Sequence, residues 1–329
     1  ERRPIIHGPR GFTLFWNTVM TMIARRLLLA ASSNAWLRER AMRTGFVRRS
    51  VSAFMPGERL ADAMAAAAAQ QARGVNTIFT NLGENLTRAS DAEAVTEHYL
   101  QALDEVAAAG LRGQISVKPT QLGLDFYEAL CLENLRRLVD RAASRGNAVW
   151  IDMESSPYVD RTLHLFRRLR ERSDAVGVAL QAYLRRTAAD LDSLMPLGPA
   201  VRIVKGAYLE PTSEVFPAKR DVDENFYRLS CRVLDDPAPK PGPGLHIATH
   251  DSRLVDRLGF FISSRQGQVP PYEYAMLYGI QRPLQERLLR AGQPLRVLIA
   301  YGDYWFPWYM RRLAERPADV WFVVRNIFQ

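Results

Sequence analysis

The sequence predicts an α/β fold in which eight βα units form a (β/α)8 barrel, preceded by a helical segment. From about residue 75 onward, short β-branched or apolar runs alternate with longer amphipathic stretches, and eight such runs occupy about 250 residues. Strands that alternate with helices pair in parallel, because each helix carries the chain back along the sheet. We therefore assign residues 1–74 to an N-terminal helical segment that packs on the barrel, and residues 75–329 to the barrel itself.

The predicted strands follow one another at intervals that suit a barrel. They are Val75–Leu82, Gln114–Thr120, Ala148–Glu154, Val176–Tyr183, Ala200–Tyr208, Leu245–Asp251, Tyr272–Tyr278 and Arg296–Tyr301. The helical stretches between them include Ala92–Ala109, Phe126–Ser144, Asp160–Arg172, Val222–Leu234 and Leu254–Arg265. A doubly wound open sheet is the alternative, but no GxGxxG motif follows the first strand and the chain has no Walker loop.

The N-terminal segment contains an apolar stretch, Phe12–Ala31, that Asn17, Arg25 and Arg26 interrupt. It falls short of the roughly 20 predominantly apolar residues that span a bilayer. We expect an amphipathic helix that packs on the body of the protein or lies on a membrane surface. The first residue is Glu1, which leaves open whether native residues precede it.

Composition limits the classes of partner and site. The chain has 329 residues and a formal net charge of +9, which favours an acidic partner such as nucleic acid, an anionic membrane or an anionic ligand. Cys131 and Cys231, its two cysteines, are far apart in the sequence, which argues against a disulfide framework and for a reducing, cytoplasmic compartment. The five histidines lack the spacing of a zinc site, so we expect no metal.

Polar side chains gather where the predicted strands end. In a barrel these ends meet at one face, and that face carries the chemistry. Many of the side chains are cationic, which indicates a ligand with several negative groups, such as a pyrophosphate and a carboxylate. The residues concerned are Glu84, Lys118, Asp152, Glu154, Gln181, Arg202, Lys205, Thr249, His250, Asp251 and Tyr278, followed by the helix that carries Arg311 and Arg312.

Paired arginines follow the last predicted strand. Arg311 and Arg312 lie four and three residues before Glu315, close enough on a helix for its carboxylate to orient them. Two guanidinium groups held together can bind a small carboxylate through paired hydrogen bonds. An ordinary ion pair on a surface helix is the alternative for this motif taken alone.

Seven motifs, taken together and in order, resemble the proline dehydrogenase family of flavoenzymes. They are Ile115–Gly123 (ISVKPTQLG), Ile151–Glu154 (IDME), Leu180–Tyr183 (LQAY), Val201–Tyr208 (VRIVKGAY), Ile247–His250 (IATH), Leu277–Gly279 (LYG) and Met310–Glu315 (MRRLAE). The resemblance runs from about residue 13 to the C-terminus, more loosely in the N-terminal part. It implies a distorted (β/α)8 TIM barrel that binds FAD, oxidises L-proline to 1-pyrroline-5-carboxylate by hydride transfer to flavin N5, and passes electrons on, typically to a membrane quinone.

The resemblance also implies roles for individual residues. Catalytic roles would fall to Lys118, Asp152 and Arg202, with Arg202 near flavin N5. Further cofactor contacts would come from Gln181, Val204, Lys205, Gly206, Thr249 and His250. Substrate contacts would come from Lys118, Asp152, Tyr208, Leu277, Leu298, Arg311, Arg312 and Glu315. Taken singly, several have structural alternatives: Lys118 and Asp152 as an ion pair, Gln181 as a core amide, and Thr249 and His250 as caps of the following helix.

The sequence departs from the family pattern at two places. The last strand usually carries Tyr-x-Pro-x-Gly, but here it reads Leu298-Ile-Ala-Tyr-Gly302, and an acidic position near the first strand has become Thr80. Loss of a phenol ring at Leu298 would open space for a substituted proline or another cyclic secondary amino acid, although a tolerated exchange in a proline enzyme is the alternative. A non-catalytic relative that holds a flavin or a membrane is a further alternative. Nucleic-acid binding is the weakest, because the basic residues are scattered.

Overall fold

The structure is a computed structural model that describes residues 51, 54–83, 86–236, 241–266 and 268–306. The chain divides into two compact units, Phe54–Gly302 and a second unit formed by Glu1–Ala53 with Asp303–Gln329. Nearly all of the described residues belong to the first unit. Within the described ranges, no helix combines the length and the apolar character needed to cross a membrane.

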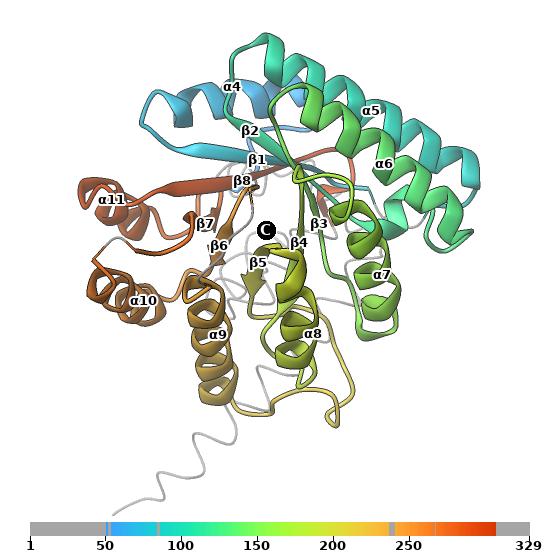
Figure 1. The fold of residues 1–329 in the computed structure, drawn as a ribbon. Coiled ribbons are helices and arrows are strands. Elements are labelled where there is room, and N and C mark those ends of the chain that lie inside the picture. Colours follow the sequence, from blue (N-terminus) through green and yellow to red (C-terminus); the bar gives the residue numbers. More distant parts are fainter. Residues whose placement is uncertain (1–50, 52–53, 84–85, 237–240, 267, 307–329) are drawn as a thin grey trace, which may run out of the picture. The chain divides into compact units, whose positions relative to one another are not determined.

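Eight parallel strands close into a barrel in which neighbours in the sequence are neighbours in the sheet (Figure 1). They are β1 (Asn76–Asn81), β2 (Gly113–Val117), β3 (Val149–Ile151), β4 (Val176–Gln181), β5 (Ala200–Val204), β6 (Leu245–Ala248), β7 (Tyr272–Leu277) and β8 (Leu295–Tyr301). β8 closes the barrel against β1, with Leu298 opposite Ile78. Each strand overlaps one of the eight predicted runs, so the predicted (β/α)8 barrel is confirmed.

Helices surround the barrel and separate its strands along the chain (Figure 1). They are α5 (Ala89–Ala108), α6 (Glu128–Ser144), α7 (Val159–Arg170), α8 (Thr187–Leu194), α9 (Lys219–Leu234), α10 (Ser252–Ser264) and α11 (Arg282–Arg290), with α4 (Leu60–Gln71) before β1. The five predicted helical stretches correspond to α5, α6, α7, α9 and α10. The sequence gives a weaker signal for α8 and α11 because each has two to three turns and therefore few apolar repeats.

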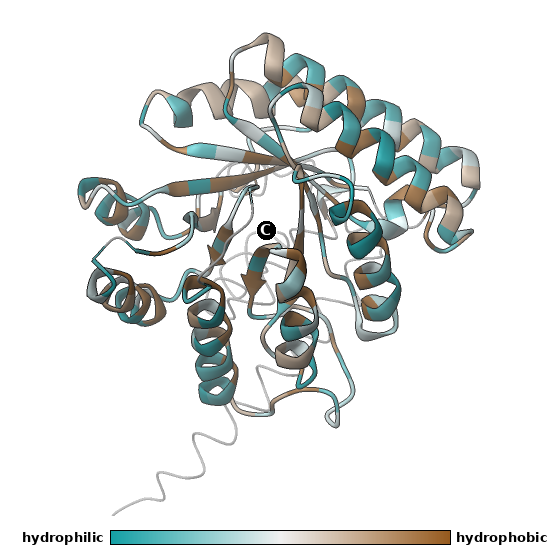
Figure 2. Cartoon of the chain, viewed as in Figure 1, coloured by the Kyte–Doolittle hydropathy of each residue, from teal (hydrophilic) through white to brown (hydrophobic). Residues whose placement is uncertain are grey.

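The helices pack on the barrel through apolar stripes. In α7, Leu163, Phe166 and Leu169 are buried at spacings of three residues, while the last turn carries Arg167 and Arg168. This is the pattern of a helix with one face on a core and the other in water. Figure 2 shows the same banding of hydrophobic and hydrophilic residues on the outer helices.

The strands bury both of their faces, and the two faces differ. On β8, the side chains of Val297 and Ile299 join the main core shared with the helices. Leu298, between them, packs instead against a separate cluster of Ile78, Trp150 and Ala200. Because side chains alternate along a strand, this second cluster lies inside the barrel.

The barrel interior also holds a charged group near the start of the strands. The Glu273 carboxylate on β7 accepts hydrogen bonds from Arg296 and Asn76, and it lies 3.3 Å from His246 Nε2. Burial opposes the charge on Glu273, but His246 and Arg296 outweigh it and lower the pKa to about 2. Burial lowers the pKa of His246 to about 3, so the imidazole is neutral in the folded protein.

These buried groups predict a loss of stability in mild acid. Below pH 6.5 the unfolded chain protonates His246, whereas the folded protein does so only near pH 3, and Glu273 acts in the same direction below pH 4.5. We expect the free energy of unfolding to fall by about 1 kcal/mol per pH unit through His246. Urea unfolding between pH 7 and pH 4.5 should show a flatter pH dependence for His246→Gln than for wild type. His164→Gln, at an exposed site on α7, is the control, and an unchanged slope for His246→Gln would contradict the prediction.

Candidate active site

An ion pair between buried Arg202 and half-buried Asp152 joins three strands where they approach the C-terminal end of the barrel. On β5, Arg202 Nη1 donates to Asp152 Oδ1 at 3.1 Å and to Ser116 Oγ at 2.8 Å. Ser116, on β2, donates in turn to Asp152 Oδ1 at 2.7 Å. Asp152 follows β3 directly, and Lys118 follows β2. The structure thus brings two of the three predicted catalytic residues into direct contact.

Ser116 is a member of this group that the sequence analysis did not name. Its hydroxyl bridges the two charged side chains, which fixes the carboxylate and the guanidinium relative to each other. A serine within an apolar run gives little signal alone. It lies two residues before Lys118, however, and residues two apart on a strand share a face, so the strand period could have identified it.

Arg202 has hydrogen-bonding capacity that the described residues do not use. Its side chain is about 5% exposed, and burial lowers the pKa to about 10, which still leaves the group charged at neutral pH. Nε and Nη2 are buried and have no hydrogen-bond partner in the part of the chain that the structure describes. Buried donors are rarely left unpaired, so this geometry suits a ligand that presents hydrogen-bond acceptors to the guanidinium.

A second group of charges lies beyond β5. Lys205 donates to Asp223 at 2.5 Å and to Asp251 at 2.9 Å, and Lys219 pairs with the same two carboxylates. Hydrogen bonding to Asp223 raises the pKa of Lys219 to about 12. Burial opposes the charge on Asp251, but the two ammonium groups lower its pKa. Two cations and two anions balance, so an anionic ligand of Lys205 would compete with these carboxylates.

Gly206 allows the backbone to pass close to an aromatic ring. Its φ of +117° is in a region that L side chains rarely adopt, and a Cβ there would lie 2.2 Å from Tyr183 Cδ1. Tyr183 N–H donates to the carbonyl of Lys205 at 2.8 Å, which holds the two loops together. The segment after β5 therefore requires glycine for both conformation and space.

The remaining predicted cofactor residues lie at the ends of β4, β5 and β6. Gln181 donates through Nε2 to the carbonyl of Glu154 at 2.8 Å, as the core-amide alternative expects. Val204 ends β5 and is half-buried. Thr249 Oγ1 accepts from Asp251 N–H at 3.1 Å, and His250 Nε2 accepts from Leu277 N–H at 3.0 Å.

The cap of α10 is neither of the two residues proposed for it. Asp251 is the N-cap and accepts a hydrogen bond from Arg253 N–H at 3.2 Å. Thr249 supports this cap through its hydrogen bond to Asp251, while His250 ties the end of β6 to β7.

Besides Lys118 and Asp152, some of the predicted substrate residues are described by the structure and others are not. Leu277 and Leu298 are register partners on β7 and β8, and both are half-buried. Tyr208 lies in the connection between β5 and α9 with 36% of its surface exposed. Arg311, Arg312 and Glu315 lie outside the described residues, as does Glu84.

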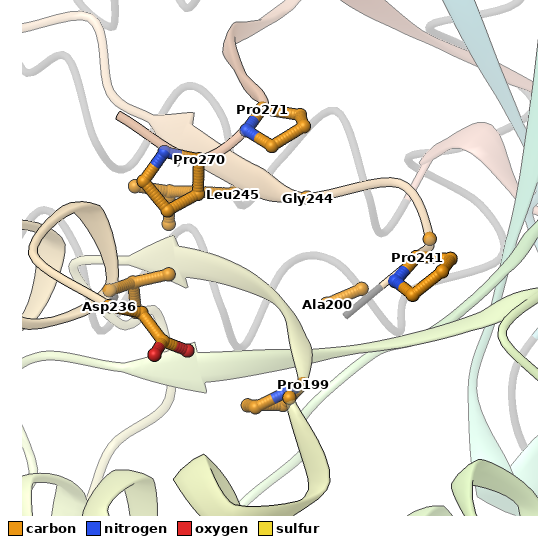
Figure 3. Close-up of a pocket in the computed structure, with 11 residues that line it drawn as sticks. Pro199, Ala200, Asp236, Pro241, Gly244, Leu245, Pro270 and Pro271 are labelled. Carbon is orange, nitrogen blue, oxygen red and sulfur yellow. The ribbon is translucent and has the colours of Figure 1, made fainter. Parts of the chain in front are cut away.

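A hollow at the opposite end of the barrel does not compete with this site (Figure 3). It lies where β5 and β6 begin, and its lining includes Pro199, Pro241, Pro270 and Pro271. Its volume of about 20 Å³ is enough for about one water molecule. This hollow is therefore too small to hold a substrate or a cofactor.

Comparison with known sequences gives consistent matches over most of the chain. A family model described as proline dehydrogenase matches residues 63–325. Proline dehydrogenase 2 of Bacillus subtilis is 32% identical over 306 residues, which cover 93% of this chain and 99% of the relative. Proline dehydrogenase of Deinococcus radiodurans is 35% identical over 281 residues, which cover 84% of this chain and 89% of the relative.

Solved structures share the fold. Proline utilization A (PutA) from Bdellovibrio bacteriovorus aligns with a TM-score of 0.76 and 20% identity, over 90% of this chain and 36% of that one. The corresponding protein from Corynebacterium freiburgense aligns with a TM-score of 0.67 and 20% identity, over 92% and 34%. This chain thus spans about a third of those larger proteins, and at this identity the likeness concerns the fold.

The contact between Gly206 and Tyr183 predicts a costly substitution. Gly206→Ala should lower the free energy of unfolding by about 2–4 kcal/mol, because backbone strain adds to a steric clash. Gly146→Ala is the matched control: its φ of +63° is also positive, but nothing lies within 4 Å of a Cβ there, so about 1 kcal/mol is expected. Urea denaturation of both variants measures the difference, and equal losses would show that the Tyr183 contact is unimportant.

Proposed function

The chain belongs to the proline dehydrogenase family, and we propose on this premise that it is an oxidoreductase that converts L-proline to 1-pyrroline-5-carboxylate with FAD. The observation that carries the proposal is the buried group of Ser116, Asp152 and Arg202 at the catalytic end of the barrel. It provides a cation beside a carboxylate, and two nitrogens of that cation, Nε and Nη2, have no hydrogen-bond partner among the described residues.

The residues after β4, β5 and β6 suit the cofactor. The unpaired donors of Arg202 fit the acceptor atoms of an isoalloxazine ring, and the Gly206 segment permits a close backbone approach. In this proposal Gln181, Arg202 and Val204 hold the ring, Lys205 and Gly206 hold the pyrophosphate, and Thr249 and His250 hold the ribityl or phosphate region. FAD, when bound, supplies the hydride acceptor. Arg202 contributes a positive charge where negative charge develops.

The substrate must be oriented and must lose a proton from nitrogen. In this proposal Arg311 and Arg312, oriented by Glu315, bind its carboxylate. Lys118 and Asp152 control the protonation of the amine. The amine nitrogen must present an unprotonated lone pair before a hydride can leave the neighbouring carbon. Ser116 and Arg202 hold Asp152 in place for this task. Tyr208, Leu277 and Leu298 complete the pocket.

Leu298 supports a second candidate substrate, a substituted proline or another cyclic secondary amino acid. Its side chain is half-buried inside the barrel, next to Leu277 and against the cluster of Ile78, Trp150 and Ala200. A leucine here offers neither the ring nor the hydroxyl that the family pattern usually provides. A pocket lined by apolar side chains discriminates weakly against a slightly larger ligand, so a broader specificity follows.

We further propose a membrane quinone as electron acceptor, and a cytoplasmic location with contact to the inner face of the membrane. The net charge of +9 supports attraction to an anionic surface. The two cysteines are unpaired, in keeping with a reducing compartment. For the organisation of the chain we retain residues 1–74 as an N-terminal helical segment and residues 75–329 as the catalytic barrel. Helix α4 of the N-terminal segment contacts β1 and β8.

The first expected outcome concerns the cofactor and the reaction. The purified protein should be yellow or reconstitute with FAD, and L-proline should bleach the flavin band under anaerobic conditions. Pyrrolidine, which lacks the carboxylate, should bleach it at least about 100-fold more slowly, because the arginine pair then has nothing to bind. A protein that does not bind FAD, or whose flavin is unaffected by every cyclic amino acid tested, would contradict the proposed function.

The second expected outcome concerns specificity. Leu298→Tyr should improve kcat/KM for L-proline relative to 4-hydroxyproline by about 10-fold, because the ring fills the space next to Leu277. Flavin bleaching by a panel of prolines measures this ratio. Leu298→Met, which keeps an apolar side chain of similar volume, is the control and should leave the ratio near that of wild type. If wild type already prefers L-proline as strongly as Leu298→Tyr does, the proposal that Leu298 broadens the specificity is wrong.

A further inference from the structure

The indole of Trp150 lies inside the barrel, one layer below the proposed catalytic group. Trp150 is fully buried on β3, two residues before Asp152, so both side chains point inward. Its Nε1 donates to Gln114 Oε1 at 2.8 Å. The guanidinium carbon of Arg202 lies 4.7 Å from the centroid of the indole, within the range of a cation–π interaction.

Neighbouring strands are shaped to accept this large side chain. Gly177 on β4 is the register partner of Trp150, and a Cβ there would lie 2.6 Å from Cζ3 of the indole. Beyond it, the ring of His246 packs against the indole with a centroid distance of 3.9 Å and an angle of 31°. Arg202 and His246 are themselves register partners on β5 and β6. The indole therefore reaches from β3 past β4 to contact both of them.

Hydrogen bonds leave the orientation of Arg202 incompletely fixed. Within the described residues, Nη1 has partners, whereas Nε and Nη2 have none. Two hydrogen bonds at one nitrogen restrain that nitrogen but not the plane of the whole guanidinium. A hydrogen-bond acceptor in the place of Trp150 would restrain the plane of the guanidinium only by occupying another of its donors. An aromatic face can hold the cation without occupying any.

We propose that Trp150 is a positioning residue whose indole face fixes the guanidinium of Arg202 and leaves Nε and Nη2 free for the cofactor. This inference rests on the proposed function, since Arg202 is the group that would meet the cofactor. Burial inside the barrel strengthens the interaction because no water competes for the cation. Trp150 touches neither substrate nor cofactor in this role and acts through Arg202.

Removing the aromatic face should slow the chemical step and leave substrate binding nearly unchanged. For Trp150→Leu we expect the rate constant of anaerobic flavin reduction by L-proline to fall about 10- to 100-fold, because a displaced Arg202 no longer meets the cofactor correctly. The KM for proline and the FAD content should stay within about 3-fold of wild type. Trp150→Phe keeps an aromatic face and should recover most of the rate. Phe166→Leu, which removes a buried ring from the outer core, should lower stability without slowing reduction.

A stability cycle tests the same contact without cofactor. In the FAD-free protein, we compare the single substitutions Trp150→Leu and Arg202→Met with the double substitution. The effect of the double substitution on the unfolding equilibrium constant should differ from the product of the two single effects by roughly 2- to 30-fold. Gly177→Ala displaces the indole without changing its chemistry and should slow flavin reduction more mildly. Gly177→Ala also tests the positioning role if Trp150→Leu does not fold.

The outcomes separate this inference from the proposed function. If L-proline does not reduce the wild-type flavin, the proposed function fails, while the FAD-free cycle still tests the contact. If wild type is reduced and both Trp150→Leu and Gly177→Ala react at the wild-type rate, the positioning role is wrong. Independent, multiplicative effects in the cycle would also overturn it.

Discussion

Burying the charge of Arg202 inside the barrel is the constraint on which the arrangement around it depends. Removing a guanidinium from water is costly unless a counter-charge and hydrogen bonds replace the lost hydration. The counter-charge comes from Asp152 after β3, and Ser116 on β2 ties the two together. Three strands must therefore keep a fixed register, and the closed barrel provides it because each strand is held on both sides. Within the described residues, Nε and Nη2 of Arg202 have no hydrogen-bond partner, which is the property expected of a group that must also serve a ligand.

Charges elsewhere in the barrel are balanced separately at different levels along its axis. Near the start of the strands, Glu273 is paired with Arg296. Beyond the strand ends, Lys205 and Lys219 share two carboxylates. Side chains in a barrel of this type stack in layers, so groups in one layer compensate each other most directly. Trp150 contacts a member of each group: its indole packs against His246, which lies beside Glu273, and against Arg202.

The sequence was sufficient for the barrel and for part of the site, for a physical reason. Strand periodicity and run length are local, so eight runs predicted eight strands, and position near the predicted strand ends singled out Asp152 and Arg202, which the fold brings into contact. The features that could not be predicted from the sequence depend on contacts between distant segments. The fit of Trp150 into the space left by Gly177 requires knowledge of the register between β3 and β4. Likewise, Lys219 and Asp223 have the spacing of an ordinary helix pair, and only the fold shows that Asp251 joins them.

The residues proposed to select the substrate and to orient Arg202 share one part of the interior. Leu298 packs against the cluster that contains Trp150, and the face of Trp150 lies against Arg202. Protein interiors are close-packed, so a change in volume at one member displaces its neighbours. A larger residue in place of Leu298 would therefore press on this cluster as well as fill the space beside Leu277. Under these two proposals, the size of residue 298 is limited from two sides, by the substrate and by the aromatic face that holds Arg202. A leucine at this position is consistent with both limits when a tryptophan belongs to the same cluster.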